Sequence, residues 1–201
     1  TEANPIKEIL LERVMSGDLP LLTRSFLSSP VVDRDGYPYF VNPVSDGIPL
    51  MTRELLDEVV GAVVDACDLD CDVVLAPEAM GIPLAAGITL RTGIPYAVIR
   101  KRMYGLPGEI RLDQHTGYSA SPMYVNGVSP GERVAIVDDV ISTGGTVRAI
   151  VCALRAAEVE VTEFVAVYSK QKDVSGLSGD LGIPVRYLLA VSSEGGRPAL
   201  L

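Results

Sequence analysis

Two adjacent carboxylates and a run of hydroxyl and glycine residues are the most chemically informative feature of this sequence. Residues 134–137 are uniformly apolar, and Asp138 and Asp139 follow them directly. The chain then turns through Ser142, Thr143, Gly144, Gly145 and Thr146. A strand that leads through such a turn into a helix offers backbone N–H groups and about half a positive charge to a phosphate. The pattern therefore predicts a site for a phosphorylated ligand.

The paired carboxylates need a partner, because adjacent negative charges repel and are costly to bury alone. At a strand end they can meet sugar hydroxyls and a hydrated Mg²⁺. The turn has no lysine, so it is not the G-x-x-x-x-G-K-[ST] loop, and its glycine spacing does not match a G-x-G-x-x-G dinucleotide loop. An ordinary capped helix start would explain Ser142 but not the whole pattern.

Two further segments suit an anion. After the apolar residues 72–76 the chain turns through Glu78, Ala79, Met80 and Gly81. Backbone amides near Gly81, at the start of a helix, could accept an anion. The next strand is followed by three consecutive cations, Arg100, Lys101 and Arg102. Such a run fits a multiply charged anion, although a solvated charge run also accounts for Arg102.

The elements that must position these residues alternate between strands and helices. Short apolar runs predict strands over residues 72–76, 95–99, 134–137, 164–167 and 185–189. Helical spacing predicts helices over residues 82–91 and around Val147, Ile150, Val151 and Leu154. Uniformly apolar strands separated by helices indicate an α/β fold with a mainly parallel, Rossmann-like sheet covered on both faces. Right-handed crossovers then place every strand-to-helix turn at one edge of that sheet.

The flanking segments are less regular. Apolar residues between Ile6 and Val14 predict an opening helix, and Asp35-Gly36 predicts a hairpin within residues 31–40. Thr52 can cap a helix with an apolar stripe from Leu55 to Val64. Residues 102–123, which include His115, predict a long functional loop that covers the ligand.

Composition bounds the possible functions. The chain has 201 residues, 48% hydrophobic and 21% charged, as expected for one globular domain. Its net charge of −9 argues against a broad nucleic-acid surface. Residues 73–90 are apolar but interrupted by Glu78, prolines and glycines, and the N-terminus shows no leader pattern, so no membrane partner is expected. The three cysteines form no disulfide pattern, which favours a reducing cytoplasm. Because the chain has a single histidine, the cysteines are expected to be small buried residues rather than zinc ligands.

Residues 134–146 resemble the phosphoribosyl pyrophosphate (PRPP) motif of the type I phosphoribosyltransferases, a hydrophobic strand leading to paired acids and T-G-G-T. Residues 75–83 resemble the pyrophosphate loop of that family, and residues 99–102 resemble its basic run. Further segments resemble the archaeal-type hypoxanthine/guanine group, so that the resemblance covers about residues 25–190. These segments are residues 38–40, 45–49, 104–109 and 116–118.

The resemblance implies one phosphoribosyltransferase domain over residues 1–201, with a hood over about residues 1–50, a core over 51–190 and a tail over 191–201. It implies that Asp138 and Asp139 hold the ribose hydroxyls directly or through Mg²⁺-bound water, and that residues 142–146 cradle the 5′-phosphate. Pyrophosphate would be bound by Glu78, Ala79, Met80, Gly81, Arg100 and Lys101, and Lys101 would also be catalytic. The family implies a flexible loop over PRPP, a homodimer and transfer to a purine. Hypoxanthine or guanine is favoured, with adenine and xanthine as alternatives.

Two departures from the family pattern bear on the acceptor. Ser169, Lys170 and Gln171 stand where the purine group commonly carries a Glu-Lys-Gly-like sequence, and the tail over residues 192–196 is predicted to be disordered rather than to cover the base. Glu109 is a candidate proton acceptor or hydrogen-bonding partner for the base, with solvation in a helix or loop favoured, and His115 is expected to be a surface residue. A PRPP-sensing regulator without catalysis and an orotate-type pyrimidine enzyme remain alternatives.

Overall fold

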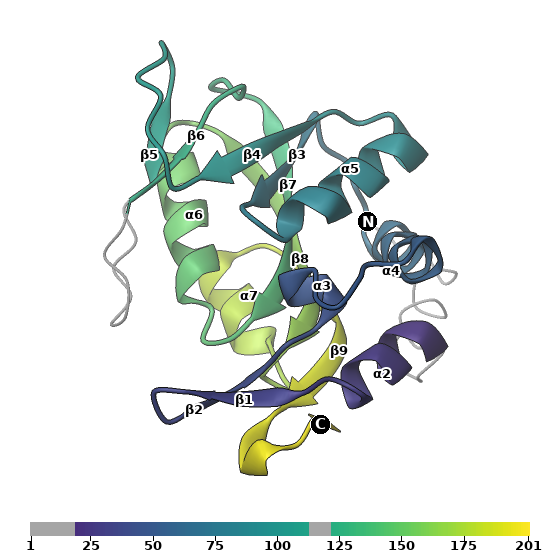
Figure 1. Cartoon of the computed structure of the whole chain (residues 1–201). Coiled ribbons are helices and arrows are strands. Elements are labelled where there is room, and N and C mark those ends of the chain that lie inside the picture. Colours follow the sequence, from purple (N-terminus) through teal and green to yellow (C-terminus); the bar gives the residue numbers. More distant parts are fainter. Residues whose placement is uncertain (1–18, 113–121) are drawn as a thin grey trace.

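The computed structural model of the protein describes residues 19–112 and 122–201 (Figure 1). The predicted opening helix between Ile6 and Val14 lies outside the described residues. So do His115 and residues 116–118.

A mainly parallel sheet forms the centre of the molecule. In the described part of the chain its strand order is β10-β9-β8-β7-β3-β4-β6-β5. Strands β9, β8, β7, β3 and β4 are mutually parallel, whereas β5, β6 and β10 add antiparallel edges. The strands are β3 (Val73–Pro77), β4 (Tyr96–Arg100), β5 (Ile110–Leu112), β6 (Met123–Val125), β7 (Arg133–Ile141), β8 (Glu160–Ser169), β9 (Val185–Ser192) and β10 (Ala199–Leu200). This sheet confirms the predicted α/β fold.

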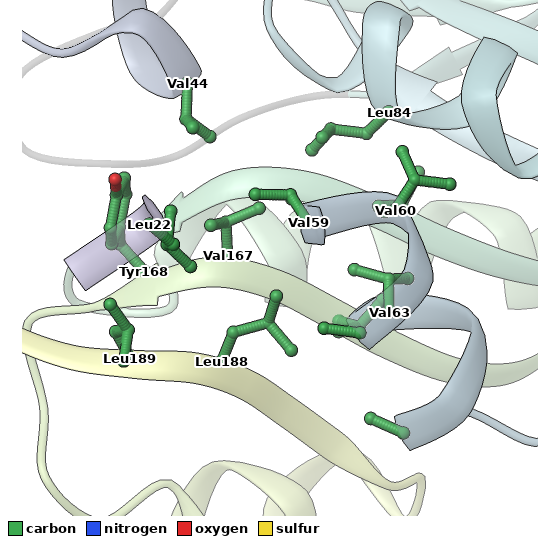
Figure 2. Packing of buried hydrophobic residues seen from close by; sticks show 14 of the residues in the cluster. Leu22, Val44, Val59, Val60, Val63, Leu84, Val167, Tyr168, Leu188 and Leu189 are labelled. Atoms are coloured by element: carbon green, nitrogen blue, oxygen red, sulfur yellow. The ribbon is translucent and has the colours of Figure 1, made fainter. Parts of the chain in front are cut away.

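Helices cover both faces of the sheet, and each face has its own apolar core. Helices α4 (Arg53–Ala66) and α5 (Gly81–Thr92) lie on one face, and α6 (Gly145–Ala156) and α7 (Ser175–Leu181) lie on the other. Figure 2 shows the first core, where Val59 and Val63 of α4 lie above the sheet residues Val167 and Leu188. As predicted, Thr52 caps α4 by accepting a hydrogen bond from the backbone of Leu55.

Strand β7 is longer than the sequence pattern predicts. The apolar run ends at Val137, but the strand continues to Ile141 because β8 pairs with it along its whole length. Asp138 lies opposite Ala166, and Ile141 lies opposite Ser169. The prediction that the paired acids follow the strand is therefore wrong, since they lie within it.

Residues 102–123 are only partly a loop. Strand β5 pairs with β6, and β6 pairs with β4, so that the segment extends the sheet at its edge. The alternation of side chains explains this, since Leu112, Met123 and Val125 are buried in the second core. The single long loop that the sequence predicts is thus wrong at residues 110–112, where β5 forms, and at residue 123, where β6 begins.

The described part of the hood contains α2 (Pro20–Leu27), β1 (Val31–Arg34), β2 (Tyr37–Phe40) and α3 (Pro43–Asp46). The hairpin is the one predicted, and Asp35 and Gly36 have the positive φ angles of its turn, 53° and 83°. Neither short helix is predicted by the sequence pattern.

The tail is ordered, contrary to the prediction. It forms a 3₁₀ turn, η1 (Glu194–Gly196), and the edge strand β10, which pairs with β9. The hydroxyl of Ser193 donates a hydrogen bond to the carbonyl of Pro38 over 2.6 Å. The tail is held because it contacts the hood hairpin, a partner that local sequence does not reveal.

The hood docks on β8 through three aromatic rings and one buried amide. The ring centroids of Phe26, Phe40 and Tyr168 lie 5.2–5.5 Å apart. The amide of Asn42, which is fully buried, accepts hydrogen bonds from the Tyr168 hydroxyl over 3.0 Å and from the Val44 backbone over 2.9 Å. Its nitrogen donates to the hydroxyls of Ser25 and Ser29. One side chain therefore joins α2, α3 and β8.

We predict that Asn42→Ala lowers the free energy of unfolding by about 2–4 kcal/mol, because it leaves several buried polar groups without partners. Tyr168→Phe removes one of these bonds and should cost about 1 kcal/mol. Urea denaturation measures both. The control is Tyr187→Phe, which removes an exposed hydroxyl bonded to the carbonyl of Lys172. A loss for Asn42→Ala no larger than that of the control would contradict the proposed anchor.

Candidate functional site

The turn between β7 and α6 has the geometry of an anion cradle. Gly144 caps α6 with φ of 80°, a backbone conformation that glycine adopts without strain. A Cβ atom there would lie 2.9 Å from Leu177 Cδ2, so the position has no room for a side chain. The first N–H groups of α6 have no partner within the helix, and they point out of its N-terminal end together with the positive end of its dipole.

A cavity of about 680 Å³ opens at this turn. Its lining brings together Asp138, the turn residues 142–146 and the hood residues 34–37. Its size lies within the usual range for small-molecule sites, about 300–1,000 Å³. Sequence reasoning predicted Asp138 and the turn but missed the tip of the hairpin. The only signal was the resemblance carried by the neighbouring residues 38–40.

The two carboxylates have different surroundings. The backbone N–H of Asp139 donates to Asp138 Oδ1 over 2.9 Å. Asp138 lines the cavity. Asp139 lies on the hood side, where its negative charge adds to burial in raising the pKa of Tyr168 and Tyr39. Asp138 thus lines the cavity, and the charge of Asp139 acts on tyrosines of both the hood and the core.

Burial dominates the electrostatics of this pair. It raises the pKa of Asp138 well above its usual range, and the charge of Asp139 raises it further. Burial also raises the pKa of Asp139. Charged carboxylates in such a place are stabilised by a cation. Oxygen donors suit Mg²⁺, which proteins often hold through one or two carboxylates while ligand phosphates and water complete its shell. Within residues 19–112 and 122–201 no group of three or more acidic, histidine or cysteine side chains could hold a metal ion, so an ion here would share oxygens with a ligand.

The turn after β3 packs directly against β7. A Cβ atom on Gly81 would lie 2.9 Å from the carbonyl oxygen of Val137, the residue before Asp138. Glycine is therefore required for this close approach. Met80 caps α5, and the peptide bond between Glu78 and Ala79 is cis. Of the four turn residues singled out from the sequence, Gly81 thus lies against the residue that precedes the paired acids.

Glu78 connects this turn to the basic run after β4. Its carboxylate accepts a hydrogen bond from the backbone of Lys101 over 2.9 Å and lies 3.4 Å from Arg100 Nη1. Since β3 and β4 are parallel, the two turns share one edge of the sheet. Lys101 is exposed, whereas the Arg102 guanidinium lies 5.6 Å from the ring centroid of Tyr104. Glu78 therefore orients the cations, with its own charge already partnered.

Comparison with known proteins agrees with this arrangement. A family described as "Phosphoribosyl transferase domain" matches residues 54–178. The chain belongs to the phosphoribosyltransferase family. It is 45% identical over 179 residues to "Hypoxanthine/guanine phosphoribosyltransferase" of Methanohalophilus mahii, covering 89% of this chain and 94% of the relative. It is 51% identical over 152 residues to "HGPRTase-like protein 2" of Haloterrigena turkmenica, covering 76% and 84%.

Solved structures support the fold of this phosphoribosyltransferase. Adenine phosphoribosyltransferase from Thermoanaerobacter pseudethanolicus superposes with a TM-score of 0.70 at 20% identity, covering 86% of this chain and 99% of that one. The enzyme from Leishmania tarentolae gives 0.68 at 19% identity, covering 87% and 88%. At such identities the likeness concerns the fold alone.

Glu109 of the phosphoribosyltransferase organises its own loop. Its carboxylate accepts hydrogen bonds from the backbones of Tyr104 and Gly105 and from the amide of Asn126. The bond from Asn126, together with the two backbone bonds, lowers the pKa of Glu109. An ionised carboxylate with three donors closes the turn over residues 104–109. The sequence favoured simple solvation of Glu109 over a role at the base, whereas the structure gives its carboxylate three donors within the protein.

Residues 169–171, which depart from the family pattern, contact the turn over residues 142–146 and the hood. Gln171 Nε2 donates to the carbonyl of Ser142 over 2.6 Å, and the buried Ser169 hydroxyl donates to the carbonyl of Gln171. The Lys170 ammonium donates to the Tyr37 hydroxyl and lies 4.4 Å from the centre of that ring. Residues 169–171 therefore hold two walls of the cavity in place.

Because the folded chain raises the pKa of Asp138, it binds that proton more tightly than the unfolded chain does. The cost of ionisation is absent below the unfolded pKa of about 3.9 and appears as the pH rises above it. We predict that Asp138→Asn has a higher free energy of unfolding than the wild type at pH ~7, and that this gain shrinks as the pH falls toward about 4. Urea titrations across that range measure it.

The matched control is Asp65→Asn, which makes the same charge change at an exposed position of α4. A ligand-free Asp138→Asn protein less stable than the wild type at neutral pH would show that the buried carboxylate is not a cost to the fold.

Proposed function

We propose that this phosphoribosyltransferase transfers the 5-phosphoribosyl group of PRPP to a ring nitrogen of a purine base and releases pyrophosphate. The observation that carries the proposal is the cavity that joins Asp138 to the hydroxyl and glycine turn at the start of α6. Relatives named hypoxanthine/guanine phosphoribosyltransferase, 42–46% identical over most of this chain, support a purine as the acceptor. Hypoxanthine and guanine are favoured, and adenine and xanthine are the alternatives.

The chain's own residues bind and stabilise charge. Residues 142–146 anchor the 5′-phosphate, and Asp138 and Asp139 stabilise the ribosyl group as it becomes positively charged. The bond from the anomeric carbon to the pyrophosphate oxygen breaks, and a bond to the purine nitrogen forms on the opposite face. The proton of that nitrogen passes to the released pyrophosphate or to water. Arg100 and Lys101, together with the turn after β3, receive the departing pyrophosphate.

Mg²⁺ is the proposed cofactor, since the oxygen donors of Asp138 and Asp139 suit it. When bound, it supplies positive charge that offsets the negative charge on the pyrophosphate. The carboxylates hold it directly or through water.

We predict that pyrophosphate release from PRPP requires Mg²⁺ and one particular base when adenine, hypoxanthine, guanine, xanthine and orotate are tested separately. Asp139→Asn should lower turnover about 100-fold or more, because it removes charge stabilisation at the reacting sugar. The control is Asp65→Asn. Wild-type turnover in folded Asp139→Asn would contradict the assignment. PRPP binding by calorimetry without release for any base would point instead to a regulator that senses PRPP.

We also propose a homodimer, as the family resemblance implies. Apolar side chains on the α5–β4 segment support a second copy as its partner, because Leu90 is 89% exposed and Tyr96 is 39% exposed. Light scattering should give twice the chain mass for the wild type and for the control Leu27→Glu on α2. Leu90→Glu should shift the mass toward a single chain. A wild type that is a single chain at every concentration would refute the proposal.

We propose the cytoplasm as the compartment of this protein, and nucleic acid is not among its proposed partners. Cys67, Cys71 and Cys152 are all free thiols, which supports the cytoplasm as the compartment. None of the helices over residues 19–112 and 122–201 combines the length and apolarity that crossing a membrane requires. The net charge of −9 gives nucleic acid no broad surface to bind. Cell fractionation that finds the protein outside the cytoplasm would contradict this placement.

A further inference from the structure

The phosphate turn lacks a cation of its own. It supplies hydroxyls, backbone amides and about half a positive charge from α6, whereas a phosphate monoester carries a charge of about −1.5 to −2 near neutral pH. Two carboxylates of the same cavity, Asp35 and Asp138, add negative charge around it. A phosphate bound at the turn therefore needs positive charge from another part of the chain.

Arg34, at the end of β1, is the one cationic residue among those that line the cavity in the described part of the chain. Its guanidinium carbon lies 3.9 Å from the ring centroid of Tyr39, so the group is stacked on the ring. Stacking uses the face of a guanidinium and leaves the N–H donors at its edge available. Over residues 19–112 and 122–201 no carboxylate forms a salt bridge with Arg34.

Three contacts hold the hairpin that carries Arg34. Within the turn, the backbone N–H of Gly36 donates a hydrogen bond to Asp33 Oδ1 over 2.9 Å. This bond also engages the carboxylate of Asp33, which precedes Arg34 on β1. On one side Lys170 donates to the Tyr37 hydroxyl, and on the other Ser193 donates to the carbonyl of Pro38. The guanidinium is therefore presented to the cavity by a supported element.

Lys170 is a second cation that contacts the hairpin, and the structure gives it a different task. Its ammonium lies 4.4 Å from the ring centre of Tyr37 and 5.2 Å from that of Phe40, and it is bonded to the Tyr37 hydroxyl. It does not line the cavity. Lys170 thus holds the hairpin, and Arg34 supplies the charge.

We propose that Arg34 binds the 5′-phosphate of the ribosyl substrate from the hood side, opposite the amides and hydroxyls of residues 142–146. The inference rests on the proposed function and deepens it, because it makes the hood part of the phosphate site. Hood and core would then both have to be in place before the phosphate is fully bound.

Titration calorimetry with ribose 5-phosphate tests this directly. Arg34→Gln should raise the dissociation constant about tenfold, since a charge-assisted hydrogen bond is lost. Arg34→Lys keeps the charge but loses the planar guanidinium that stacks on Tyr39. Its dissociation constant should therefore lie between those of the wild type and Arg34→Gln. Arg24→Gln, an exposed arginine of the hood on α2 that does not line the cavity, should bind as the wild type does. Thermal unfolding of each variant confirms that the exposed substitutions leave the fold intact.

Magnesium pyrophosphate is the second titrant, and its affinity should be unchanged in Arg34→Gln. Unchanged binding of ribose 5-phosphate by Arg34→Gln would overturn the inference. An equal loss of affinity for ribose 5-phosphate and magnesium pyrophosphate would overturn it as well. Such a loss would indicate that the charge of Arg34 acts on both anions at long range rather than through a contact with the 5′-phosphate. A rise confined to the KM of the purine would assign Arg34 to the base and also overturn it. A wild type that binds neither ribose 5-phosphate nor PRPP would refute the proposed function itself.

Discussion

The position of the hood depends on one buried side chain. Asn42 uses both hydrogen-bonding atoms of its amide, and its partners belong to α2, α3 and β8. A buried amide of this kind stabilises a single arrangement, since any displacement leaves polar groups without partners. The hairpin over residues 31–40 is therefore held at a defined place above the core. The cavity exists because this placement closes one side of it.

The parallel sheet supplies the other side. Because β3, β4 and β7 run in the same direction, the turns that follow them meet at one edge. Close packing then brings these turns together, with Gly81 against the carbonyl of Val137 and Glu78 bonded to the backbone of Lys101. Turns that are far apart in the sequence thereby become neighbours at this edge of the sheet.

Charge in the site is arranged for a bound ligand rather than for the empty protein. Burial raises the pKa of Asp138 and Asp139, so their ionised forms are costly until positive charge arrives. In an acidic chain, the cation Arg34 lines the cavity, and Arg100 and Lys101 lie at the end of strand β4. A site that binds a highly anionic substrate together with Mg²⁺ would satisfy both sets of charges at once. Ionisable groups whose pKa values are shifted by burial are typical of functional sites.

The sequence by itself determined the alternation of strands and helices, the hairpin at Asp35-Gly36, the cap at Thr52 and the turn over residues 142–146, because each depends on local periodicity or local backbone chemistry. Only the tertiary structure decided that β7 continues past Asp139, since that requires pairing with β8. It also decided that α2 and α3 form, that residues 110–112 and 123–125 pair as strands and that the tail is ordered. The placement of Arg34 in the same cavity as residues 142–146 belongs to the same class. Each of these depends on a contact between residues distant in the chain, and no local pattern encodes such a contact.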